Sequence, residues 1–76
     1  MDLRDVFASN LRRLRHEKDL SQEELADMAR INRTYVSKLE TSATYAGLEI
    51  IGKLADVLEI DAAELLRRPP RRGRPR

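Results

Sequence analysis

The stretch that most restricts the fold runs from residue 21 to residue 40, where two short helical patterns follow each other almost directly. Ser21, with Glu24 three residues later, forms a capping box that begins the first helix. Asn32 is a good N-cap for the second helix. The apolar residues at helical spacing are Leu25, Ala26, Met28 and Ala29 in the first pattern and Val36 and Leu39 in the second. Only two residues separate the first pattern from the second cap, so the two helices must cross at a steep angle, as in a helix-turn-helix.

Amphipathic patterns on both sides of this pair predict further helices, and no segment alternates as a strand would. A first helix is expected over about residues 2–18 and another over about 48–58, with a polar loop of small residues over 41–47. Asp61 with Glu64 forms a capping pair for a last short helix. The apolar positions are Leu3, Phe7, Leu11 and Leu14 in the first helix, Leu48, Ile51, Leu54, Ala55 and Leu58 in the next, and Leu65 and Leu66 in the last. The expectation is an all-α, compact five-helix bundle.

The end of the chain differs from the rest in charge. Residues 67–76 hold six arginines, three prolines and Gly73 but no acidic residue, which predicts an extended basic tail. Residues 1–66 are the predicted domain, and they carry the other nine basic residues and all 13 acidic ones, a formal charge of −4. A nucleic-acid partner would therefore have to meet basic groups that are placed locally.

Composition argues against several classes of protein. The chain has no cysteine and one histidine, so it can form no disulfide and no structural zinc site of the usual kind. It contains no nucleophile and base pair, no phosphate-binding glycine loop and no metal set, so neither an enzyme nor a cofactor is expected. No apolar run is long enough for a membrane span and no signal peptide precedes the domain, which indicates a cytoplasmic protein. No second domain is present to bind a small-molecule effector.

The second helix of the pair carries a polar, basic side. At about 100° per residue, one side of it presents Arg33, Thr34, Ser37, Lys38 and Thr41. Such a surface suits a helix that enters the major groove of double-stranded DNA. Arg33 can bond guanine O6 and N7, Thr34 can touch the thymine methyl group, and Lys38 can reach a base or a phosphate. The alternative is an ordinary solvated helix face.

The sequence of this region resembles a known family. Residues 20–40, LSQEELADMARINRTYVSKLE, are similar to the helix-turn-helix of the phage-repressor-type (XRE) bacterial transcriptional regulators, which have the lambda-repressor-like fold. The likeness extends over about residues 4–66, including the end LEIIGKLADVLEIDAAELL. Within the family, residues 33–37 are similar to those of the small controller proteins of restriction–modification systems.

The resemblance implies roles for particular residues. Its base-reading positions fall on Arg33, Thr34, Ser37 and Lys38. Its DNA-backbone positions fall on Gln22, Asn32, Tyr35, Thr41, Ser42, Thr44 and Tyr45. Gln22 would contact a phosphate or buttress the recognition helix, and Tyr35 would approach DNA or pack in the core. The family's ion pair between the first helix and the end of the recognition helix falls on Arg15 and Glu40; the alternative is two exposed charges that contribute roughly 0–1 kcal/mol.

The chain departs from the family pattern in two places. Arg30 stands in the turn where glycine is usual, and a left-handed conformation there would cost an arginine about 1 kcal/mol. Either the turn differs or the strain is tolerated. The loop before Leu48 also lacks glycine and proline at the positions where the family usually has them, with Ala43 and Ala46 in their neighbourhood, which leaves its path open.

The arginine-rich tail has a motif of its own. Residues Arg71, Arg72, Gly73 and Arg74, followed by Pro75, resemble the core of an AT-hook, in which an extended Arg-Gly-Arg lies in the narrow minor groove of A/T-rich DNA. Non-specific attraction to phosphates and a merely solubilising end are the competing interpretations.

These features together predict a sequence-specific, nucleoid-associated regulator that binds a pseudo-palindromic operator as a homodimer, with half-sites about one helical turn apart. The candidate dimer contacts, which could equally be core, are Val57, Ile60, Leu65 and Leu66. The alternative is a protein-interaction module, such as an antitoxin or a coactivator-type adaptor, which the charge of −4 favours.

Overall fold

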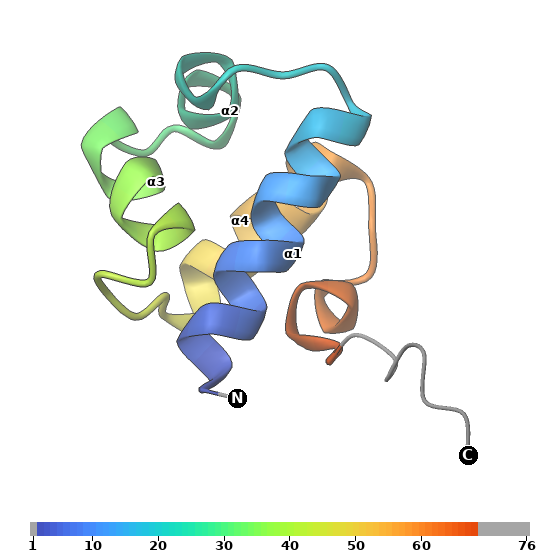
Figure 1. Ribbon diagram of the computed structural model, residues 1–76. Coiled ribbons are helices and arrows are strands. Elements are labelled where there is room, and N and C mark those ends of the chain that lie inside the picture. The colour runs from blue at the N-terminus through green and yellow to red at the C-terminus, as the bar shows by residue number, and fades with distance from the viewer. Residues whose placement is uncertain (1, 69–76) are drawn as a thin grey trace.

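The computed structural model describes residues 2–68, which form four α-helices and one short 3₁₀ helix (Figure 1). The elements are α1 (Leu3–Glu17), α2 (Gln22–Ala29), α3 (Arg33–Glu40), α4 (Leu48–Leu58) and η1 (Ala62–Leu66). No strand occurs among the described residues, which confirms the all-α prediction. The predicted count of five helices is not confirmed, because four elements are α-helices and the fifth is a short 3₁₀ segment.

The contacts of residues 61–67 explain why this segment is a 3₁₀ helix and not an α-helix. The Asp61 carboxylate accepts a hydrogen bond from the backbone N–H of Ala63 at 3.3 Å. Glu64 does not reach back to complete the expected capping box; it pairs with Arg67 at 2.9 Å. With five residues and one cap, the segment is short enough to be satisfied by the tighter i to i+3 bonds of a 3₁₀ helix.

The predicted N-caps of the central pair are confirmed. The Ser21 hydroxyl accepts from the Glu24 N–H at 2.9 Å, and the Glu24 carboxylate accepts from the Ser21 N–H at 2.8 Å. The Asn32 side chain accepts from the Thr34 N–H at 2.7 Å. Asp2 caps α1 in the same way, through the Arg4 N–H at 2.8 Å, so the first helix begins one residue later than expected.

Three of the helices end with the same backbone motif. Each is followed by a non-glycine residue in the left-handed region and then by an aliphatic residue that packs against the core. The pairs are Asp19–Leu20, Arg30–Ile31 and Glu59–Ile60. The aliphatic residue donates its N–H to a carbonyl five residues earlier, as in a Schellman motif, at 3.1 Å for Leu20, 2.9 Å for Ile31 and 3.0 Å for Ile60. Arg30, with φ of 59°, therefore adopts the left-handed turn, and the docking of Ile31 holds it there.

We expect Arg30→Gly to raise the free energy of unfolding by about 1 kcal/mol, because glycine has no Cβ to strain at positive φ. Urea denaturation of the full chain measures this change. Lys53→Gly, in the interior of α4, is the control and should lower stability by about 0.5–1 kcal/mol. A loss of stability in both variants would show that the Arg30 side chain has a stabilising role that outweighs its strain.

The helices enclose one core, and each element contributes to it. α1 packs against α3 and η1, α2 packs against α3 and α4, and α4 packs against η1. The large side chains that are fully buried are Val6, Leu11, Leu25, Val36, Leu39, Leu54, Leu58 and Leu65. Four residues expected at apolar helix positions are instead exposed: Leu3, Met28, Leu48 and Leu66. Leu3 and Leu48 are the first residues of their helices, and Met28 lies on the side of α2 away from its buried residues.

Asn10, a polar residue that no sequence pattern singled out, connects α1 to the end of the fold. Its side chain is buried, and its amide donates to the carbonyls of Leu65 at 3.0 Å and Arg67 at 2.9 Å. These bonds satisfy carbonyl groups at the C-terminal end of η1 that have no partner within the helix. They also hold residues 65–67 against α1.

Candidate nucleic-acid interface

The interface is built around an ion pair between α1 and the last residue of α3. Arg15 Nε lies 2.7 Å from Glu40 Oε2, and Arg15 Nη2 lies 3.0 Å from Glu40 Oε1. Glu40 is only 2 % exposed and Arg15 is 8 % exposed. Arg15 also donates to the Leu20 carbonyl at 2.8 Å. The pair expected from the resemblance is present, and it is a buried bidentate pair instead of two exposed charges.

Two further side chains hold the same end of α3. Gln22 donates its amide to Glu40 Oε1 at 3.0 Å, so it supports α3 from the start of α2. Arg12 donates from Nη1 to the Glu40 backbone carbonyl. A cation there satisfies one of the last carbonyls of α3 and complements its dipole. Sequence reasoning missed Arg12, because no local pattern indicates a contact between residues 28 positions apart.

The side of α3 opposite its buried residues carries the four positions predicted to read bases. Arg33, Thr34 and Lys38 are exposed and Ser37 is half-buried, while Val36 and Leu39 on the other side are fully buried. Within residues 2–68, the side chains of Arg33, Thr34 and Lys38 have no hydrogen-bond or ion-pair partner. Their donors are therefore available to an external acceptor.

The N-terminal ends of the two central helices differ in charge. The first turn of α3 contains no acidic residue, and its Asn32 cap uses only the side-chain oxygen. The first turn of α2 contains Glu23 and Glu24, so its positive end is partly neutralised. An anion is therefore attracted more strongly to the start of α3 than to the start of α2.

The predicted backbone-contacting residues after α3 do not share one surface. The Thr41 hydroxyl donates to the carbonyls of Ser37 at 3.1 Å and Lys38 at 3.2 Å, which engages its proton within the helix. Ser42 has a left-handed backbone with φ of 63°, and its hydroxyl lies 3.5 Å from the Arg4 carbonyl. Both residues stay at the C-terminal end of α3, next to the start of α1.

The remaining residues of that set point elsewhere. Tyr35 is half-buried against the core, and its hydroxyl donates to the Tyr45 carbonyl at 3.2 Å. Thr44 and Tyr45 line an apolar groove, where the Arg4 guanidinium lies 4.7 Å from the centre of the Tyr45 ring. A hydrogen bond from the backbone N–H of Arg4 lowers the pKa of the Asp2 carboxyl, and a second one from the Arg4 guanidinium lowers it further. The Arg4 guanidinium is therefore paired with the Asp2 carboxylate.

The candidate dimer contacts differ from one another in how deeply they are buried. Val57 and Ile60 are half-buried against the core, and Leu66 is exposed. Leu65 is fully buried, so its assignment as a dimer contact is wrong: the 3₁₀ turn points it inward beneath α1. The predicted tail residues Arg71, Arg72, Gly73 and Arg74 lie outside the described residues.

Residues 2–68 contain neither a cluster of metal ligands nor a membrane-spanning helix. No group of three or more histidine, aspartate or glutamate side chains there is placed to hold a metal ion. In the same range, no helix is both long enough and apolar enough to cross a bilayer.

Comparison with known proteins gives consistent matches. A model of the helix-turn-helix family matches residues 11–65. A hypothetical transcription factor of Neisseria meningitidis serogroup B is 44 % identical over 71 residues, which cover 93 % of this chain and 67 % of that protein. The control protein C.SmaI of Serratia marcescens is 34 % identical over 68 residues, covering 90 % of this chain and 81 % of that protein.

Solved structures agree with these relatives. The crystal structure of the Neisseria factor superposes with a TM-score of 0.87 and covers 90 % of this chain and 78 % of its own. The restriction–modification controller protein C.AhdI of Aeromonas hydrophila is 40 % identical, with a TM-score of 0.79 and coverage of 82 % of this chain and 94 % of its own. The resemblance noted for residues 20–40 is thereby confirmed.

Proposed function

This chain belongs to the helix-turn-helix family of DNA-binding transcriptional regulators, and on that premise we propose that it reads a pseudo-palindromic operator as a homodimer. The observation that carries the proposal is the outward side of α3. The side chains of Arg33, Thr34 and Lys38 have no partner within residues 2–68, while the last residue of α3 is held by a buried ion pair. A recognition helix needs this combination of available donors and a rigid support.

In the proposed complex, α3 enters the major groove with its N-terminal end first. Arg33 donates to guanine O6 and N7, and Thr34 contacts a thymine methyl group. Ser37 and Lys38, one turn later, reach the adjoining bases or a phosphate. Phosphates flank the helix at Asn32 and at the start of α2, where Gln22 lies, and these contacts fix the register without reading sequence.

The remaining backbone contacts would come from the side of α3 nearest its C-terminal end. Thr41 and Ser42 are the proposed phosphate contacts there, with Tyr35, Thr44 and Tyr45 further along the connection. A contact that uses the Thr41 hydroxyl as donor has to replace its bonds to the α3 carbonyls. Two copies related by a two-fold axis would place their recognition helices about 34–36 Å apart, one helical turn of DNA. Binding to bacterial DNA would put the protein in the cytoplasm.

The second candidate is a protein-interaction adaptor, which the formal charge of −4 over residues 1–66 favours. The two functions differ in their response to salt. A regulator should bind its operator at nanomolar concentrations with a steep loss of affinity as salt rises, and an adaptor should show neither property.

The decisive experiment selects bound sequences from a random DNA pool with the full chain and then titrates the selected duplex with salt. Enrichment of a two-fold symmetric sequence supports the proposal. If no sequence is enriched over the starting pool, the regulator proposal is wrong and the adaptor takes its place.

Removal of residues 69–76, which hold four of the tail arginines, is expected to weaken binding to selected and scrambled duplexes alike. Each arginine that neutralises a phosphate contributes about 0.9 to the slope of log affinity against log salt, so the slope should become shallower. A larger loss on A/T-rich flanks than on G/C-rich flanks would support the AT-hook interpretation. An unchanged slope would mean that the tail takes no part in binding.

A further inference from the structure

Arg30, in the turn between α2 and α3, belongs to a small set of basic side chains that have no partner within the described part of the fold. Within residues 2–68, every other lysine and arginine makes an ion pair, a hydrogen bond, a ring contact or another electrostatic contact with the rest of the chain. The exceptions are Arg30, Arg33 and Lys38, which lie within nine consecutive residues. The function proposed above uses the last two and leaves Arg30 without a role.

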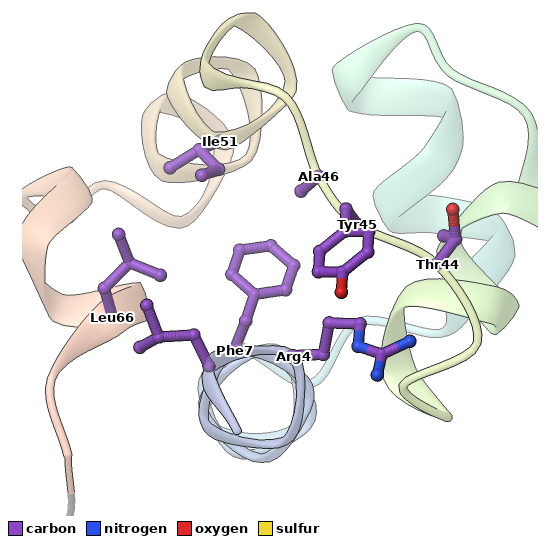
Figure 2. Close-up of a pocket in the computed structure, with 8 residues that line it drawn as sticks. Arg4, Phe7, Thr44, Tyr45, Ala46, Ile51 and Leu66 are labelled. Atoms are coloured by element: carbon purple, nitrogen blue, oxygen red, sulfur yellow. The ribbon is translucent and has the colours of Figure 1, made fainter. Parts of the chain in front are cut away.

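The cations elsewhere in residues 2–68 are held by their own fold. The Arg4 guanidinium pairs with Asp2 and lies 4.7 Å from the centre of the Tyr45 ring, at one end of the apolar groove (Figure 2). The others with a particular partner are Arg12, Arg13, Arg15, Lys18, Lys53 and Arg67. In this part of the chain, the positive charge available to an external anion is therefore concentrated at residues 30–38.

Arg30 also occupies a strained position that its side chain does not help to stabilise. Its backbone is left-handed, with φ of 59° and ψ of 46°. The packing of Ile31 against the core explains this conformation but not the presence of an arginine, since glycine adopts it without a clash. A strained residue whose side chain makes no contact with the described fold points to a function outside that fold.

The other non-glycine residues at positive φ differ from Arg30 in this respect. Glu59 pairs with Lys18, and the Ser42 hydroxyl donates to a backbone carbonyl of α1. Asp19 is of a residue type that tolerates the left-handed region well. Among the described residues, only Arg30 combines a long side chain at positive φ with the absence of a partner.

We propose that Arg30 contacts a DNA phosphate beside the start of α3, next to the base-reading Arg33. This inference rests on the proposed function. Three Cα–Cα steps separate the two residues, so their Cα atoms lie at most about 11 Å apart. A duplex whose bases meet Arg33 therefore presents its backbone close to Arg30. The planar guanidinium offers paired donors that match two oxygens of one phosphate.

Position and charge favour a phosphate over a base as the ligand. Arg30 precedes the Asn32 N-cap, so it lies outside the helical face that carries the base-reading residues. It follows the acidic helix α2, whose exposed carboxylates include Asp27, three positions before Arg30, without forming an ion pair with it. These carboxylates repel DNA, and a cation at the end of α2 offsets that repulsion where the duplex approaches α3.

The test measures the binding of the full chain to its selected operator over a range of salt concentrations. Arg30→Gln removes the charge and keeps a polar side chain, so affinity at low salt should fall about 10-fold. The slope of log affinity against log salt should become shallower by about 0.9 for each copy on the duplex. Arg30→Lys should keep the slope. Lys53→Gln, which removes one cation from α4, is the matched control and should change neither quantity.

Arg30→Gly adds a readout that separates a DNA contact from a structural role. Because it relieves the strain at positive φ, this variant should resist urea better than the unchanged chain. It should nevertheless bind DNA as weakly as Arg30→Gln, so that stability and affinity change in opposite directions. A fall in both would mean that Arg30 acts through the fold, which overturns the inference.

Scrambled DNA identifies the kind of contact. Equal losses of affinity for operator and scrambled duplexes in Arg30→Gln support a phosphate contact. A loss confined to the operator, with a relaxed preference at one position, would mean that Arg30 reads a base. An unchanged salt slope would mean that Arg30 is an ordinary solvated side chain. Either of these two results overturns the inference.

The same measurements separate this inference from the proposed function. If the unchanged chain selects an operator and Arg30→Gln keeps its salt slope, only the assignment of Arg30 fails. If no sequence is selected but Arg30→Gln still makes the slope shallower on a random duplex, the regulator proposal fails and the phosphate contact stands. A chain that binds no duplex overturns both.

Discussion

Replacing Arg15 by methionine is expected to lower the free energy of unfolding by about 3–5 kcal/mol, because it leaves the Glu40 carboxylate buried without its countercharge. Glu40 is 2 % exposed, and Arg15 supplies two of its three side-chain hydrogen bonds. Native proteins typically have a free energy of unfolding of about 5–15 kcal/mol, and a small domain lies toward the low end of that range. The variant should therefore be close to unfolding. Urea denaturation followed by circular dichroism measures the loss.

The matched control is Arg13→Met on the same helix. Its ion pair with Glu17 is exposed and 3.4 Å long, so the change should cost no more than about 1 kcal/mol. The double variant Arg15→Met with Glu40→Gln should recover part of the loss, since it removes the unpaired charge as well. Equal effects of Arg15→Met and Arg13→Met would mean that the buried pair contributes no more than a surface pair.

Arg33→Ala is expected to cost about 1–3 kcal/mol of binding to the selected operator and to relax the preference at one base position in each half-site. Arg33 is the first residue of α3 and is exposed without a partner in the described part of the chain, so its loss should leave the fold intact. Competition between the operator and single-position variants of it measures both effects.

The control for this experiment is Lys53→Ala, which removes a cation from α4 and should leave the base preference unchanged. If Arg33→Ala weakens binding to operator and scrambled DNA equally, Arg33 contacts a phosphate and the proposed base-reading role is wrong. Because the same loss appears in both half-sites of a two-fold operator, a change in only one half-site would contradict the homodimer.

The sequence by itself determined the helices and the starts of the central pair, because those signals are local. The Ser21 capping box and the Asn32 cap act over two or three residues, and the buried stripe of Leu25, Ala26 and Ala29 repeats within one short helix. The outward side of α3 follows from the same periodicity. Its family resemblance was also carried by one continuous stretch, residues 20–40.

Which residues at the helix ends are exposed could be seen only in the tertiary structure. Periodicity assigns a residue to one face of a helix, but it does not show whether a neighbouring element covers that face. Leu48 continues the apolar stripe of α4 but is 86 % exposed, and the adjacent residues Leu65 and Leu66 are buried and exposed, respectively. The sequence also left two possibilities for Arg30. The left-handed turn occurs because the burial of Ile31 against the core compensates for the strain.

Side-chain contacts between distant residues were decided only by the packing of the helices. Arg15 meets Glu40 across 25 positions, Arg12 reaches the end of α3 across 28, and Asn10 reaches Leu65 across 55. Without the resemblance, no local rule connects such residues. The groove has the same origin, because three helical elements and a connection form its wall together. Local backbone preferences select the helices, and the burial of their shared faces selects which polar groups meet.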